Sequence, residues 1–77
     1  MKVILYTQEG CGLCRDAEAM LRRMQKKNRF ELEFVDIEAD SSAHALYWAR
    51  IPVITLDGEE VASAPLDERR LAAALSA

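Results

Sequence analysis

The segment that decides the fold covers residues 3–14 and reads VILYTQEGCGLC. Its first five residues are β-branched, aromatic or large aliphatic, a composition typical of a strand that is buried on both faces. From Leu13 onward, apolar residues recur every three or four positions, which predicts an amphipathic helix that ends near Asn28. Cys11 and Cys14 therefore stand between the first strand and the first helix.

The rest of the chain alternates between strand and helix patterns. The Asp57-Gly58 dipeptide tolerates the positive φ angles of a tight turn, so the strands on either side of it should form an antiparallel hairpin. Asp67 can cap the last helix. The predicted strands and helices lie, in order, near residues 3–7, 13–28, 30–37, 43–47, 51–56, 60–63 and 67–75. This β-α-β-α-β-β-α order predicts an α/β fold with a four-stranded mixed sheet and three helices.

Length, charge and composition limit the function. The 77 residues suffice for one domain, 1–77, because folding units rarely divide below about 100 residues. The net charge of −3 disfavours binding to nucleic acid. The longest apolar runs, 3–6 and 71–75, are far shorter than the roughly 18 to 20 residues that span a bilayer, and no secretory signal is visible. We therefore expect a cytoplasmic protein without a nucleic-acid or membrane partner.

The two cysteines form a single Cys-x-x-Cys motif. Residues three apart on a helical turn can form a disulfide with little backbone movement. Backbone amides at a helix start lower the pKa of a thiol, so we expect Cys11 to be the nucleophile and Cys14, one turn further on, to resolve the mixed disulfide. Gly12 leaves the first sulfur accessible. Glu9 and Arg15 would act on that thiol in opposite directions.

Two other interpretations of the cysteines are inert structural thiols and a metal site. A structural zinc site needs four ligands, and His44 is the only further strong candidate in the chain. A site in which the thiolates of two chains hold one metal ion is a further interpretation. We expect His44 itself to be an ordinary surface or semi-buried residue.

With the motif and Ile51-Pro52-Val53 in place, the chain resembles the glutaredoxin branch of the thioredoxin-like superfamily, in particular small bacterial glutaredoxin-like proteins. The similarity covers Val3 to about Leu75. It implies a thioredoxin-like fold. It also implies that Pro52 follows a cis peptide bond, faces the cysteines and leaves the backbone of Ile51 free to pair with a thiol substrate. Gly12 and Leu13, between the cysteines, are expected to contact the substrate too.

Three departures from the glutaredoxin pattern concern glutathione. The usual lysine three residues before the first cysteine is Gln8, the Thr-Val before the proline is Arg50-Ile51, and the usual Gly-Gly-x-Asp-like turn is absent from residues 63–67. Arg50 or Arg15 could replace the lost cation, and Asp67 could meet an ammonium group. We expect Gln8 and Arg50 to contact the substrate. Glutathione is a possible co-substrate that these departures disfavour.

The predicted activity is thiol–disulfide exchange that contributes to cell redox homeostasis. The expected partners are a disulfide-bearing protein or a low-molecular-weight thiol, together with an external reductant. We expect a monomer with no permanently bound cofactor. Two alternatives remain: an iron–sulfur cluster or metal carrier that uses Cys11 of two chains, and a redox-inert thioredoxin-fold module that only binds partners.

Overall fold

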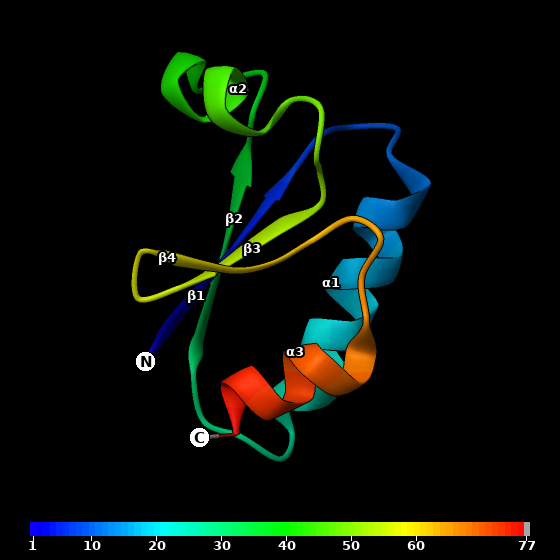
Figure 1. Cartoon of the computed structure of the whole chain (residues 1–77), viewed down its shortest axis with the longest axis vertical. Coiled ribbons are helices and arrows are strands. Elements are labelled where there is room, and N and C mark those ends of the chain that lie inside the picture. The colour runs from blue at the N-terminus through cyan, green and yellow to red at the C-terminus, as the bar shows by residue number, and fades with distance from the viewer. Residues whose placement is uncertain (77) are drawn as a thin grey trace.

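The computed structural model describes residues 1–76 and contains one four-stranded sheet with three helices (Figure 1). Every predicted element is present, in the predicted order. The elements are β1 (Lys2–Thr7), α1 (Gly12–Gln25), β2 (Glu31–Asp36), α2 (Ser41–Tyr47), β3 (Val53–Leu56), β4 (Glu59–Ser63) and α3 (Glu68–Leu75). The thioredoxin-like order of elements is therefore confirmed.

The sheet has the strand order β2-β1-β3-β4. β1 pairs in parallel with β2 and antiparallel with β3, and β3 pairs antiparallel with β4. Tyr6 has Val35 and Val53 as its two cross-strand neighbours. Both edges of β1 are therefore paired, and this strand is central in the sheet.

Helices α1 and α3 pack on the same face of the sheet (Figure 1). Leu21 of α1 and Leu71 of α3 are both fully buried. Burying a side chain of this kind contributes roughly 1.5–3 kcal/mol, so this cluster is the main stabilising core. Its buried members are Val3, Leu5, Ala17, Leu21, Met24, Ile54, Leu71 and Leu75.

The second face of the sheet is covered only in part. Ile4 and Tyr6 are half-buried there, so the prediction that β1 is buried on both faces is correct for one face only. The physical reason is that α2 has only seven residues, of which Ala43 alone is buried. Leu46 of α2 is 63% exposed.

Local side-chain contacts fix the turn and the helix starts. Asp57 and Gly58 have φ angles of 50° and 89°, as the hairpin prediction requires. The backbone N–H of Lys2 donates to Asp57 Oδ1 at 2.8 Å, which ties the turn to β1. Asp40 caps α2 and Asp67 caps α3, so the expected cap of the last helix is confirmed.

Candidate functional site

A tight turn delivers Cys11 to the start of α1. The N–H of Cys11 donates to the carbonyl of Gln8 at 3.2 Å, and Gly10 in this turn has a φ of 83°. That angle lies in the left-handed region, which glycine adopts at little cost. Cys11 itself is extended, with φ −88° and ψ 108°, and is the N-cap residue of α1. The chain thus leaves the central strand and places a sulfur directly at a helix start.

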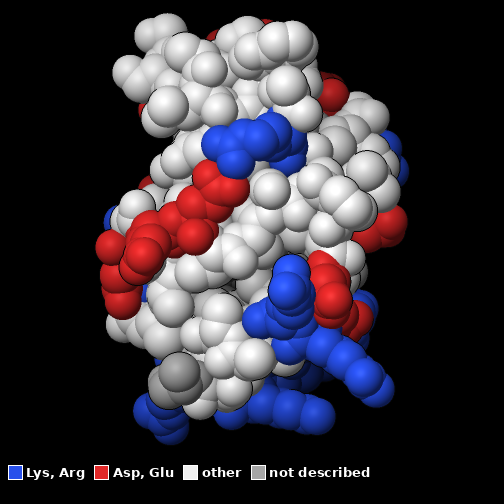
Figure 2. Space-filling view, viewed as in Figure 1, with Lys and Arg blue, Asp and Glu red and all other residues white. Residues whose placement is uncertain are grey.

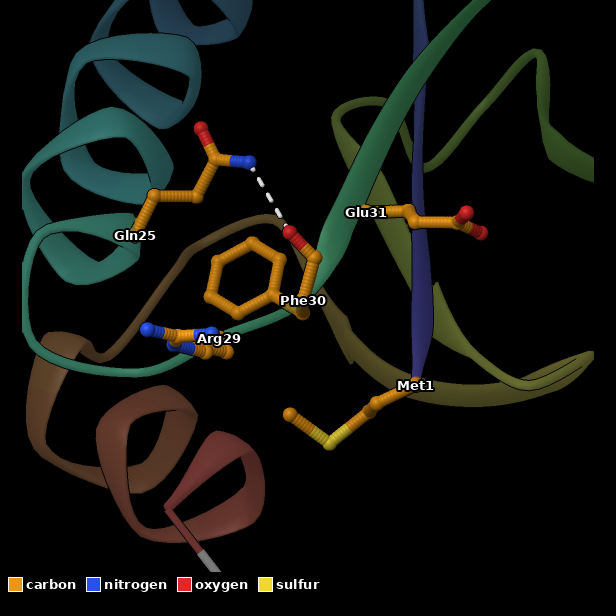
Figure 3. Close-up of a pocket in the computed structure, with 5 residues that line it drawn as sticks. All are labelled: Met1, Gln25, Arg29, Phe30 and Glu31. Atoms are coloured by element: carbon orange, nitrogen blue, oxygen red, sulfur yellow. Dashed lines mark hydrogen bonds between the residues drawn. The ribbon is translucent and has the colours of Figure 1, made fainter.

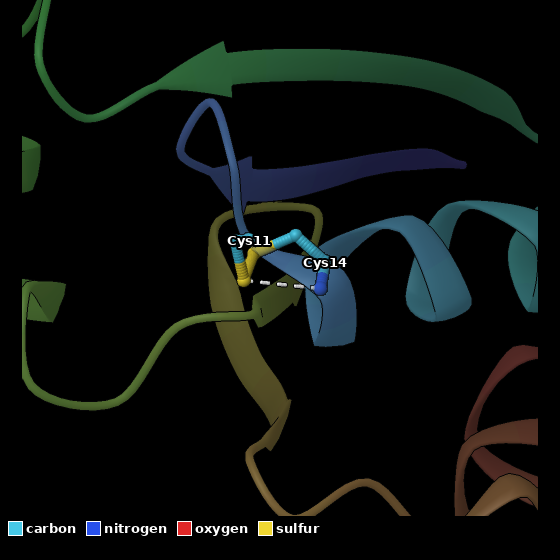
Figure 4. Close-up of a disulfide and its surroundings, with 2 residues drawn as sticks. All are labelled: Cys11 and Cys14. Atoms are coloured by element: carbon cyan, nitrogen blue, oxygen red, sulfur yellow. Dashed lines mark hydrogen bonds between the residues drawn. A yellow bond between two sulfur atoms is a disulfide. The ribbon is translucent and has the colours of Figure 1, made fainter.

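The two cysteines face each other across the first turn of α1 and are paired as a disulfide (Figure 4). Their Cα atoms are 5.2 Å apart. The backbone N–H of Cys14 donates to Cys11 Sγ at 3.1 Å, which is the position that a capping side chain occupies at a helix start. Reversible closure of this pair therefore needs no rearrangement of the helix.

The two sulfurs differ in exposure. Cys11 is half-buried and reachable from solvent, whereas Cys14 is 2% exposed and lies one turn inside the helix, next to the core. The first turn of α1 contains no acidic residue. The unpaired amides and the positive end of the helix dipole therefore favour negative charge on Cys11.

A pocket of about 240 Å³ lies beside the motif. Leu13 and Pro52 line it together, so the residue between the cysteines and the proline before β3 share one cavity. The Ile51-Pro52 bond is cis, as the resemblance implied, and so is the Ala64-Pro65 bond, which nothing in the sequence singled out. The lining residues are Leu13, Asp16, Met20, Pro52, Ala64, Pro65 and Leu66.

The other expected contact residues lie outside this pocket. The amide of Gln8 donates to the carboxylate of Glu38. Arg50 Nη1 donates to Glu60 Oε2 at 2.6 Å, and the Arg50 guanidinium lies 5.5 Å from the centre of the Tyr47 ring. Both polar side chains that were expected to contact a substrate are thus paired with neighbouring acids, and their role in binding stays a prediction.

Gly12 and Ile51, two further expected contact residues, offer backbone groups rather than polar side chains. Gly12 is the exposed first residue of α1. Ile51 is half-buried just before the cis bond, and among residues 1–76 its N–H and C=O have no backbone hydrogen-bond partner. A free donor and acceptor at this point could pair with an extended chain.

The pocket contains residues that the sequence interpretation did not assign to a site. Among residues 1–76, Asp16 is the only charged residue that lines it. Leu13, Asp16 and Met20 follow one another at steps of three and four, so they share one side of α1. That spacing was visible in the sequence. The approach of Pro65 and Leu66 from the loop before α3 was not visible there, because no local sequence pattern indicates it.

Two further surface features lie away from the motif. A hollow lined by Met1, Gln25, Arg29, Phe30 and Glu31 lies at the carboxyl end of α1, where the Gln25 amide donates to the Phe30 carbonyl at 3.0 Å (Figure 3). Basic side chains gather mainly over the lower part of the molecule, around α3 and the carboxyl end of α1 (Figure 2).

Residues 1–76 contain neither a metal-binding cluster of side chains nor a membrane-spanning helix. No group of three or more His, Cys, Asp or Glu side chains is placed to hold a metal ion within this stretch. None of the helices formed by these residues is long and apolar enough to cross a membrane.

Comparison with known proteins agrees with this geometry. Residues 2–76 match the family described as Glutaredoxin-like domain (DUF836). The chain belongs to this glutaredoxin-like family. An uncharacterized protein of Mycobacterium tuberculosis is 30% identical over 77 residues, which cover 94% of this chain and 79% of that protein.

Solved structures share the fold of this chain. A protein from Nitrosomonas europaea is 37% identical with a TM-score of 0.81, over 96% of this chain and 89% of that one. A protein from X. campestris is 29% identical with a TM-score of 0.79, over 96% and 95% of the two chains. Thioredoxin O2 from Arabidopsis thaliana, at 21% identity and a TM-score of 0.73 over 97% and 71%, shares the fold.

Proposed function

We propose that this glutaredoxin-like protein is a thiol–disulfide oxidoreductase that uses both cysteines. In the first step the Cys11 thiolate attacks one sulfur of a substrate disulfide, and the other substrate sulfur leaves as a thiolate that takes up a proton. In the second step Cys14 gives up its proton and attacks Cys11 Sγ. The second substrate thiol is released as the Cys11–Cys14 disulfide forms. Two electrons and two protons thus pass to the substrate.

The observation that carries the proposal is the different placement of two sulfurs within one helical turn. Cys11 is accessible and accepts the Cys14 N–H at 3.1 Å, an interaction that favours a thiolate. Cys14 is 2% exposed, so it is poorly placed to meet a substrate but close enough to reach Cys11. Redox-inert thiols would need neither the accessibility nor the amide.

A protein or peptide disulfide fits the site better than glutathione does. Glutathione carries two carboxylates, and no lysine or arginine lines the pocket beside Pro52. Arg50, the expected cation beside Ile51 and Pro52, is paired with Glu60. The regenerating reductant is an external thiol or dithiol, which returns two electrons and two protons to the Cys11–Cys14 disulfide. We propose that the protein acts as a cytoplasmic monomer in redox homeostasis.

The test is turnover of a model protein disulfide with dithiothreitol as the reductant. Wild type should accelerate the reduction, and Cys11→Ser should abolish the acceleration. Cys14→Ser should lose multiple turnover with a protein disulfide while still forming an adduct. Leu46→Ala, a change on the exposed side of α2, serves as a control and should retain wild-type turnover. Equal activity of wild type and Cys11→Ser would refute the proposed function.

A further inference from the structure

The pocket beside the motif contains one charged residue among apolar ones. Asp16 lines it together with Leu13, Met20, Pro52 and other residues that carry no charge. The carboxylate is exposed, and within residues 1–76 it takes part in no ion pair and no side-chain hydrogen bond. It is therefore free to pair with a cation that a ligand brings.

Two other carboxylates, those of Asp67 and Glu18, already interact with groups of the chain itself. Asp67 Oδ1 accepts the N–H groups of Arg69 and Arg70 at 3.0 and 3.2 Å, as the cap of α3. Glu18, on the next part of α1, forms an ion pair with Arg22 at 3.0 Å. Of Asp16, Glu18 and Asp67, Asp16 is thus the one that is available to a ligand and lines the pocket.

Resting on the proposed function, we infer that Asp16 determines substrate specificity: the pocket selects disulfides whose cysteine has a lysine or arginine two residues away. An apolar side chain of the substrate would occupy the space between Leu13 and Pro52. The cation would pair with the carboxylate at the rim of the pocket. The preferred substrate is therefore a basic polypeptide segment, in contrast to the acidic tripeptide glutathione.

The distance along α1 sets the position of that cation. Asp16 follows Cys11 by five residues, which corresponds to about 7.5 Å along the helix axis. Two residues of an extended chain span about 6.6 Å, and residues two apart point to the same side. A cation two positions from the reacting cysteine would thus face Asp16. A cation three positions away would point to the opposite side.

The inference is tested with peptides that form a mixed disulfide with a chromogenic thiol. The peptides share one sequence and carry Lys, Gln or Glu either two or three positions from the cysteine, on each side in turn. The value of kcat/KM is compared within each protein variant, so that a loss of overall activity cancels. An exposed ion pair of this kind corresponds to a preference of about two- to fivefold for Lys over Gln at low salt.

Three protein variants separate the outcomes. Asp16→Asn should remove the preference for Lys, and Asp16→Lys should reverse it in favour of Glu. Glu18→Gln, which removes a carboxylate from the same helix outside the pocket, should keep the preference. High salt should weaken the preference in wild type.

Two results would overturn the inference: wild type that reduces the Lys, Gln and Glu peptides equally, or a preference that survives in Asp16→Asn. A higher rate for a cation three positions from the cysteine than for one two positions away would also contradict it. Failure of the proposed function would look different, because wild type would then reduce none of the peptides.

Discussion

Reversing the charge of Arg15 should make the Cys11 thiolate harder to form. Arg15 is exposed in the first turn of α1, a turn that contains no acidic residue. Arg15→Glu replaces a positive charge near the sulfur with a negative one. Glutamate in a first turn interacts favourably with the helix dipole, so the fold should tolerate the change. The effect on the thiol is then electrostatic.

The expected size follows from the geometry of the helix. Arg15 is four residues beyond Cys11, about 6 Å along the axis, and side-chain reach extends the separation of the charges to roughly 8–10 Å. In water each unit charge at that distance contributes about 0.4–0.5 kcal/mol, so the reversal costs the thiolate about 0.8–1 kcal/mol before screening. The midpoint of the thiolate titration should rise by about half a pH unit at low ionic strength, and by about half of that or less at physiological salt.

The assay is the ultraviolet absorbance of the thiolate as a function of pH. It is performed in a Cys14→Ser background, where Cys11 is the only thiol, at low and at high ionic strength. The matched control is Lys26→Glu, the same charge reversal at about 22 Å from Cys11 along the axis, which should move the midpoint several times less. An equal movement in both variants, or none in Arg15→Glu, would refute the electrostatic argument.

Three further predictions concern the fold. Asp67→Ala removes the acceptor of two N–H groups at the start of α3. It should lower the free energy of unfolding by about 1 kcal/mol and the melting temperature by roughly 4–8 °C, whereas Asp67→Asn should lower both much less. Gly10→Ala should destabilise the fold by about 1 kcal/mol or more because the φ of Gly10 is 83°. Gly12 lies in a helix with open space around it, so Gly12→Ala should stabilise the fold by about 0.4–1 kcal/mol. Equal effects of the two substitutions in urea unfolding would contradict this prediction. Burial is the main cause that raises the pKa of Tyr6 above 10.0, and the neighbouring Tyr47 is the second. The tyrosine therefore ionises first in the unfolded state, so the stability of the fold decreases above pH 10. Tyr6→Phe should make this decrease shallower in alkaline unfolding curves.

Patterns that act over a few residues predicted most of the fold. The apolar run before Gln8 indicated the central strand, Asp57-Gly58 indicated the hairpin turn, and Asp67 indicated the start of the last helix. Each depends on the backbone preference or hydrogen bonding of nearby residues, which the sequence displays directly. The extent of burial was less predictable. Leu46 is exposed because its helix is too short to cover the sheet, which is a property of the assembled structure.

The candidate site was predictable where it depends on one turn of helix. The spacing of Cys11 and Cys14 indicated their closeness. The pairing of Gln8 with Glu38 and of Arg50 with Glu60 was not predictable, because it joins residues that are 30 and 10 positions apart. For the same reason the pocket between α1 and the loop before α3 could not be deduced from the sequence.

The central claim is that the accessible Cys11 sulfur at the start of α1 reacts first with the substrate, and that Cys14, one helical turn further on, reacts second. Its most direct test is the reaction of reduced Cys14→Ser and, in parallel, reduced Cys11→Ser with a peptide disulfide, followed by mass spectrometry and peptide mapping. The account predicts one stable adduct per chain, on Cys11, in the first variant, and a far slower reaction in the second, because Cys14 is 2% exposed. An adduct that forms as fast on Cys14 as on Cys11, or no adduct on Cys11, would contradict it.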